Sequence, residues 1–107
     1  MLLAGTIRRD GAARISGVEP LVLDGDLWLS MMSGSAKVRD LGRDPRVVLN
    51  SVITSPSPPA ELKVRGTAHV VTEQDRRERY AAAASVEAAD PGLVTPGSAV
   101  EEGDDLG

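Results

Sequence analysis

Apolar and polar residues alternate along several short runs in the first 72 residues of the chain. Successive side chains of a β-strand point to opposite faces, so a period of two is typical of strands with one face on a core. In the clearest run the positions divide into an apolar set, Leu62, Val64, Gly66, Ala68 and Val70, and a polar set, Lys63, Arg65, Thr67 and His69. The whole pattern predicts strands at residues 2–7, 13–18, 21–23, 27–32, 47–53 and 62–71.

Turn chemistry separates these runs. Asp10-Gly11 and Asp24-Gly25 each lie between two apolar runs, and Asp-Gly readily supplies the positive φ angles of a tight hairpin turn. Residues 54–59 consist of Thr, Ser and Pro and are expected to form a loop.

Two segments predict helices. The first follows Ser35, whose hydroxyl is suited to accept hydrogen bonds from the free N–H groups of a first helical turn. It ends before Pro45, because the residue that precedes a proline is disfavoured in helical geometry. The second covers residues 73–87, where acidic residues follow Thr72 and a run rich in Ala and Arg comes next.

Six short strands with little helix predict a mainly β fold, a small six-stranded antiparallel split barrel with one short helix between strands and one C-terminal helix. Closure of a barrel removes the strand edges that otherwise pair with other chains. We expect residues 1–72 to form this barrel core and residues 73–87 to form the C-terminal helix. Residues 88–107 contain turn-like Pro-Gly pairs and a run of acids, so they predict a disordered acidic tail with no further strand.

Composition excludes several classes of function. The chain has 107 residues, no Cys and one His, which argues against disulfides and against a metal site. All 12 basic residues but only 10 of the 16 acidic ones fall in residues 1–80, so this part carries a small positive charge. With almost no aromatic residues it is a poor nucleic-acid binder, yet it suits a small anionic ligand. Without an apolar run of about 20 residues or a basic leader, neither a membrane span nor a signal peptide is expected, and a cytoplasmic protein is predicted.

The Ser35-Ala36-Lys37 step is the first functional candidate, since it opens a helix directly after a strand. A phosphate dianion is stabilised by a helix N-terminus and by a nearby ammonium group. A lysine in the first turn opposes the helix dipole unless an anion is also present, so Lys37 points to a ligand. The alternative interpretation is an ordinary solvated lysine beside a helix-capping serine.

Three segments together resemble the pyridoxamine 5'-phosphate oxidase-like split-barrel proteins, which bind flavin or deazaflavin. The first is the AGTIRRDGAARIS hairpin of residues 4–16, and the second is the DGDLWLS strand of residues 24–30 with GSAKVRDLGRDPR of residues 34–46. The third is the KVRGTA strand of residues 63–68. The resemblance covers roughly residues 2–80, and its middle segment is the most specific.

The resemblance implies a homodimer with FMN, or alternatively the deazaflavin coenzyme, bound at the subunit interface and acting on a small-molecule substrate. The residues that it places at the cofactor are Arg14, Ser16, Ser30, Met31, Ser35, Lys37 and Glu61. Among these, the basic residue of the second strand and the Ser-x-Lys step would hold the phosphate, and the backbone at residues 30–32 would meet the flavin ring. No protein acid, base or metal ligand is implied, because the cofactor carries the chemistry.

The expected function is therefore a flavin- or deazaflavin-dependent oxidoreductase that transfers hydride through its cofactor. Family members usually begin with a helix before the first strand and end with a further barrel strand, and we expect this chain to lack both. Two alternatives stay open: a non-catalytic flavin- or haem-type binding module on the same barrel, and a truncated, inactive family member. For Arg14 the alternative role is an ion pair with an acid on a neighbouring strand.

Overall fold

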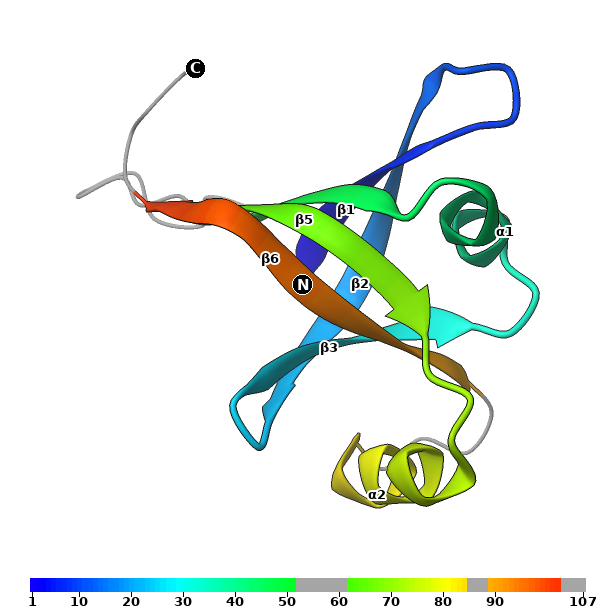
Figure 1. Cartoon of the computed structure of the whole chain (residues 1–107), viewed down its shortest axis with the longest axis vertical. Coiled ribbons are helices and arrows are strands. Elements are labelled where there is room, and N and C mark those ends of the chain that lie inside the picture. The colour runs from blue at the N-terminus through cyan, green and yellow to red at the C-terminus, as the bar shows by residue number, and fades with distance from the viewer. Residues whose placement is uncertain (52–61, 85–88, 103–107) are drawn as a thin grey trace.

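The strands form one closed antiparallel barrel, flanked by two helices (Figure 1). This computed structural model describes residues 1–51, 62–84 and 89–102. The elements are β1 (Leu2–Ile7), β2 (Ala13–Leu23), β3 (Asp26–Met32), α1 (Ala36–Arg43), β4 (Arg46–Ser51), β5 (Leu62–Val70), α2 (Gln74–Ala84) and β6 (Ala89–Glu102). Around the barrel the order is β1-β2-β3-β6-β5-β4. The predicted mainly β, six-stranded barrel with two helices is confirmed.

Strand β2 is longer than predicted. It runs unbroken through Glu19 and Pro20, so the expectation of separate strands at 13–18 and 21–23 is wrong. Its pairing with β1 ends at Val18, and beyond that residue it pairs only with β3. A proline is tolerated there because the β1 side of the strand no longer requires an N–H donor.

Strand β6 is the larger correction, since the barrel does not end at residue 72 and residues 89–102 are not a disordered tail. This strand inserts between β3 and β5 and closes the barrel. Its two Pro-Gly pairs are not turns. Gly92 lies where a Cβ would come 2.6 Å from Cε of Met31, and Gly97 where a Cβ would come 2.9 Å from the carbonyl oxygen of Arg65. Backbone pairing on both sides therefore overrides the local turn preference of this sequence.

Both Asp-Gly hairpins form as predicted. Gly11 lies in the β1–β2 turn with a φ of 87°, and Asp24 and Gly25 connect β2 to β3 with φ angles of 54° and 82°. Two consecutive residues with positive φ define the tight turn whose twist matches that of the flanking strands. This geometry fixes the register between β2 and β3.

The hydrophobic core has two parts. The barrel interior is filled by aliphatic side chains, and Leu41 from α1 joins them; the buried members are Ala4, Val18, Leu29, Met31, Leu41, Val47, Leu49, Val64, Ala68 and Val94. Each fully buried aliphatic side chain contributes about 1.5–3 kcal/mol. Helix α1 therefore packs directly on the barrel core, and its position is fixed by it.

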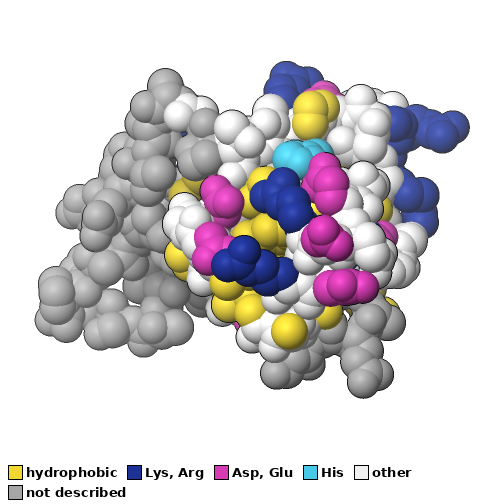
Figure 2. Space-filling model, turned by 60° about the horizontal axis from the view of Figure 1, so that its bottom comes forward, with side chains coloured by type: hydrophobic (Ala, Val, Ile, Leu, Met, Phe, Trp, Pro, Cys, Tyr) yellow, Lys and Arg dark blue, Asp and Glu magenta, His cyan; other side chains and the backbone are white. Residues whose placement is uncertain are grey.

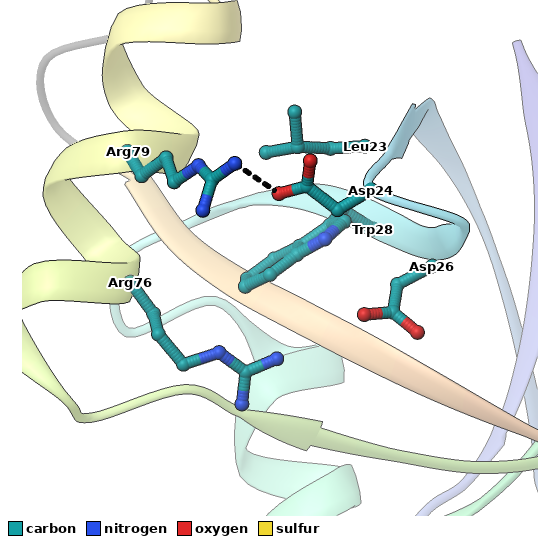
Figure 3. A pocket seen from close by; sticks show the side chains of 6 residues that line it. All are labelled: Leu23, Asp24, Asp26, Trp28, Arg76 and Arg79. Carbon is teal, nitrogen blue, oxygen red and sulfur yellow. Dashed lines mark ion pairs between the residues drawn. The ribbon is translucent and has the colours of Figure 1, made fainter.

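The second part lies outside the barrel, between β3 and α2. Trp28 and Tyr80 stack with ring centroids 5.2 Å apart, and Val71 packs beside them. The Arg76 guanidinium lies 5.3 Å from the centre of the Trp28 ring (Figure 3). Arg79 forms a 2.8 Å ion pair with Asp24 in the β2–β3 turn (Figure 3). On this face of the molecule positive and negative side chains are intermixed with hydrophobic ones (Figure 2). These contacts attach α2 to the barrel.

Candidate functional site

The N-terminus of α1 is the part of the structure that agrees best with the predicted phosphate step. Strand β3 leads through Gly34, with a φ of 71°, to Ser35, which has extended geometry and precedes the helix. The Ser35 amide donates a 3.0 Å hydrogen bond to the Met32 carbonyl, which fixes the turn. The Ser35 hydroxyl oxygen is buried, yet it has no hydrogen-bond partner in the described part of the chain and does not cap the helix. Buried polar side-chain atoms usually have a hydrogen-bond partner, and within the described residues Trp28 Nε1, Asn50 Oδ1 and the Tyr80 hydroxyl are buried without one as well.

Lys37 lies in the first turn of the same helix and is half-buried. Among the described residues its ammonium group has no ion pair or hydrogen bond. The free N–H groups of a first helical turn add positive potential at the same place. The hydroxyl of Ser35, the first-turn amides and the Lys37 ammonium therefore form a donor set that fits a phosphate group.

Arg14 and Ser16 lie on the first part of β2, which pairs with β1 and precedes the pairing of β2 with β3. Their register partners on β1 are the buried Thr6 and Ala4, so both side chains point inward. The Nε of Arg14 donates a 2.7 Å hydrogen bond to the carboxylate of Asp40 in α1. Arg14 is thus ion-paired as one interpretation predicted, although its partner lies on the helix and not on a neighbouring strand.

Asp40 connects α1 to the first two strands. Its side chain is 0% exposed and accepts hydrogen bonds from the Thr6 hydroxyl at 2.8 Å, from Arg14 and, at 2.8 Å, from Arg43. Burial raises the pKa of this carboxyl, but the bonds from Arg14, Thr6 and Arg43 outweigh burial and hold the pKa below its ordinary value. Lys37 and Asp40 are three positions apart and so share one side of α1. The network therefore brings Arg14 to the helix side that carries Lys37.

Three predicted site residues remain: Ser30, Met31 and Glu61. Ser30 lies half-buried on β3, and Met31 is buried in the barrel core, so Met31 can reach a cofactor only through its backbone. The structure does not bring these two into contact with the Arg14 network. Glu61 lies outside the described residues.

Thr6, Asp40 and Arg43 are residues that the sequence interpretation did not select. No local signal marked Asp40, because it lies one position before Leu41 and two after Val38, and residues at these spacings do not share a side of a helix. The structure nevertheless buries its carboxylate. Such a residue requires partners, and the inward-facing hydroxyl of Thr6 and the guanidinium of Arg14 supply them.

The outer face of β1, β4 and β5 carries an open groove of about 390 Å³. Its floor is Gly5, which lies between Ile15 on β2 and Val48 on β4 in the barrel register. Ile15 is 65% exposed and Val48 is 41% exposed, so apolar surface flanks the groove on both sides. Arg46 and Arg65 line its edge.

The described part of the chain holds neither a cluster of metal ligands nor a membrane-spanning helix. No group of three or more potential metal ligands occurs there. Within the same residues no helix has the length and apolar character required to cross a membrane.

The fold and the donor set at α1 define a split-barrel protein with a candidate phosphate site. The family model described as pyridoxamine 5'-phosphate oxidase matches residues 1–104. The chain belongs to the pyridoxamine 5'-phosphate oxidase family. The match extends through β6, so the barrel strand that we expected to be missing is present.

Solved structures agree at the level of the fold. A conserved hypothetical protein from Mycobacterium tuberculosis is 18% identical with a TM-score of 0.77, covering 96% of this chain and 76% of that one. A protein related to general stress protein 26, of the pyridoxinephosphate oxidase family, from Clostridium acetobutylicum is 20% identical with a TM-score of 0.69, covering 89% and 73%. The haem storage protein HutZ from Vibrio cholerae is 13% identical with a TM-score of 0.70, covering 94% and 83%. No curated protein sequence matches the chain.

Proposed function

We propose that this chain binds FMN, or alternatively the deazaflavin coenzyme, and acts as a homodimeric oxidoreductase on a small-molecule substrate. The observation that carries the proposal is the buried Ser35 hydroxyl at the N-terminus of α1, next to Lys37, since neither side chain has a partner within the described residues. Membership of the pyridoxamine 5'-phosphate oxidase family supports it, since family members commonly bind flavin. A bound flavin would supply the hydride chemistry, and the protein would supply binding and orientation.

Ser35 and Lys37 would hold the cofactor phosphate, with Arg14 contributing from β2. The Nε of Arg14 is engaged by Asp40, which leaves the terminal amino groups of this guanidinium for a ligand. Ser16 and Ser30 would add polar contacts from β2 and β3, and the backbone at Met31 would meet the ring. Glu61 stays a proposed contact from the family resemblance alone.

The apolar groove supports the homodimer. Isolated exposed apolar residues are ordinary, but Ile15 and Val48 lie on either side of Gly5 and border a groove of about 390 Å³. A second copy of the chain would cover this surface. Val48→Asp is expected to give monomers in light scattering at micromolar protein. Val22→Asp is the matched control, since Val22 is 72% exposed but does not line the groove, and it should leave the dimer intact.

The phosphate role is tested by cofactor titration followed by flavin fluorescence. Lys37→Ala is expected to weaken FMN binding by about 1–3 kcal/mol, the contribution of a charged hydrogen bond. Arg79→Ala removes the same charge at α2 and should leave FMN binding unchanged. Equal affinities of wild type and Lys37→Ala would contradict the proposal.

Ser35→Ala separates binding from folding. Replacing a capping serine by alanine normally costs about 1 kcal/mol of stability, but Ser35 makes no capping bond here, so the unfolding free energy should hardly change. FMN affinity should still fall, because the hydroxyl is reserved for the ligand. A loss of stability without a loss of affinity would show that Ser35 is only structural.

Haem is the second candidate ligand, because a haem storage protein shares the fold and the single histidine, His69, is exposed on β5. Absorbance after addition of FMN, deazaflavin or haem distinguishes the ligands directly. A protein that binds none of the three would refute both functions, and turnover of a flavin-loaded protein with a reductant separates catalysis from storage.

A further inference from the structure

A second basic site lies at the opposite end of α1. The turn between β1 and β2 and the last residue of α1 enclose an open pocket of about 240 Å³. Its lining consists of Arg8, Arg9, Asp10, Arg14 and Arg43. Four of these five side chains are guanidinium groups, and none of the proposed functions uses Arg8, Arg9 or Arg43.

The buried carboxylate of Asp40 orders one wall of this pocket. It binds Nε of Arg14 and one terminal nitrogen of Arg43, while these two side chains stay 33% and 37% exposed. Each guanidinium therefore keeps N–H groups that are not used by Asp40. Because Asp40 already holds both guanidinium groups in place, these side chains would lose little conformational entropy when a ligand binds them.

The opposite wall is less constrained. Arg8 approaches Asp10 only at 3.5 Å, and Arg9 has no ion pair or hydrogen bond within the described residues. With Asp10 and Asp40 counted against the four arginines, two positive charges are left without compensation. Like charges this close repel one another, and a dianionic ligand would remove that repulsion.

We propose that this pocket binds a phosphate or diphosphate group through Arg8, Arg9 and Arg43, as an anion site separate from the Ser35–Lys37 step to which Arg14 contributes. A phosphate monoester carries about two negative charges at neutral pH, which matches the uncompensated charge of the pocket. Arginine forks bind phosphate oxygens with two parallel hydrogen bonds. An α-helix rises about 1.5 Å per residue, so Arg43 lies roughly 10–12 Å from the start of α1 and the two sites take separate groups.

Calorimetric titration of the chain with inorganic pyrophosphate at low ionic strength tests the proposal, since exposed charges are least screened there. Arg9→Ala is the main variant, because Arg9 is exposed and has no ion pair or hydrogen bond to any described residue. The loss of one charged hydrogen bond predicts an affinity at least about tenfold weaker. Arg79→Ala, with the same change of charge at α2, should change the affinity less than about twofold.

Two further variants make the result specific. Arg43→Lys keeps the charge but loses the fork, and it should also weaken pyrophosphate binding. Lys37→Ala should leave pyrophosphate binding intact while FMN binding falls, so failure of the flavin proposal would not affect this one. The proposal is overturned if pyrophosphate does not bind at millimolar concentration, if Arg9→Ala and Arg79→Ala behave alike, or if Lys37→Ala removes the binding.

Discussion

Asp40→Asn tests whether the buried carboxylate holds α1 on the barrel. The wild-type group is fully buried and accepts hydrogen bonds from Thr6, Arg14 and Arg43. Asparagine keeps the shape but removes the charge, and its amide group turns donors toward the two guanidiniums. Helix α1 and the β1–β2 hairpin should therefore lose their common anchor.

The expected loss of stability follows from the burial of the partners. Removing one partner of a buried ion pair costs about 3–5 kcal/mol. Arg14 and Arg43 keep about a third of their side chains in water and can rehydrate, so the lower end applies, about 3 kcal/mol. Domains of this size have a total stability of about 5–15 kcal/mol, and the loss should appear as a clear shift of the urea midpoint.

The stability difference between the wild type and Asp40→Asn should also depend on pH. The pKa of Asp40 is held below its ordinary value of 3.8, so its ionised form is stabilised in the folded state. That stabilisation is complete above the unfolded pKa and is lost as the pH falls through the folded pKa. The difference between wild type and Asp40→Asn should therefore be constant near neutral pH and shrink below about pH 4.

Asp44→Asn is the matched control. Arg46 lowers the pKa of Asp44 to about 2 through side-chain and backbone hydrogen bonds, but this pair lies on the surface. Surface ion pairs contribute little, so the control should unfold close to the wild type. If both variants lose the same stability, or if the Asp40→Asn difference does not change with pH, the reasoning about the buried network is wrong.

Four further substitutions test the packing. Gly42→Ala should stabilise the protein by about 0.5–1 kcal/mol in urea unfolding, because a Cβ there meets nothing within 4 Å and alanine favours the helix. Gly97→Ala should cost about 1–3 kcal/mol, since its Cβ meets a rigid carbonyl oxygen of β5. Gly92→Ala should cost less, because its Cβ meets the flexible end of a methionine; the reverse order of the two costs would contradict the described β6 packing. Trp28→Ala should cost about 3–5 kcal/mol and expose α2 to limited proteolysis, and unchanged protection would show that Trp28 does not hold this helix.

Apart from β2, which was expected as two strands, the strands up to residue 70 and the beginning of both helices could be predicted because their signals are local. Alternation fixes which side of β5 faces the core, and Asp24-Gly25 defines its turn through its own φ preferences. Strand β6 could not be predicted in this way. Its Pro and Gly residues indicate turns when read alone, and only β3 and β5 on either side supply the hydrogen bonds that keep it extended.

The candidate site, too, was predictable only where its residues lie close together in the sequence. Ser35 and Lys37 are two positions apart in the chain, so a strand-to-helix step with a serine and a lysine indicates a phosphate site without any tertiary information. Arg14 was selected by family resemblance, but its actual partner was not foreseen. Asp40 lies 26 residues further along the chain, and nothing local relates the two residues.

The sequence by itself determined a mainly β barrel, two hairpins and a phosphate-type step at one helix, because each depends on periodicity or on the preferences of neighbouring residues. Only the tertiary structure decided that the C-terminal segment closes the barrel and that Asp40 joins Thr6, Arg14 and Arg43 under α1. It also decided that four arginines share a pocket, while the Ser35 hydroxyl has no partner among the residues that the structure describes. Contacts between distant segments depend on how the barrel closes, and closure is a property of all its strands together.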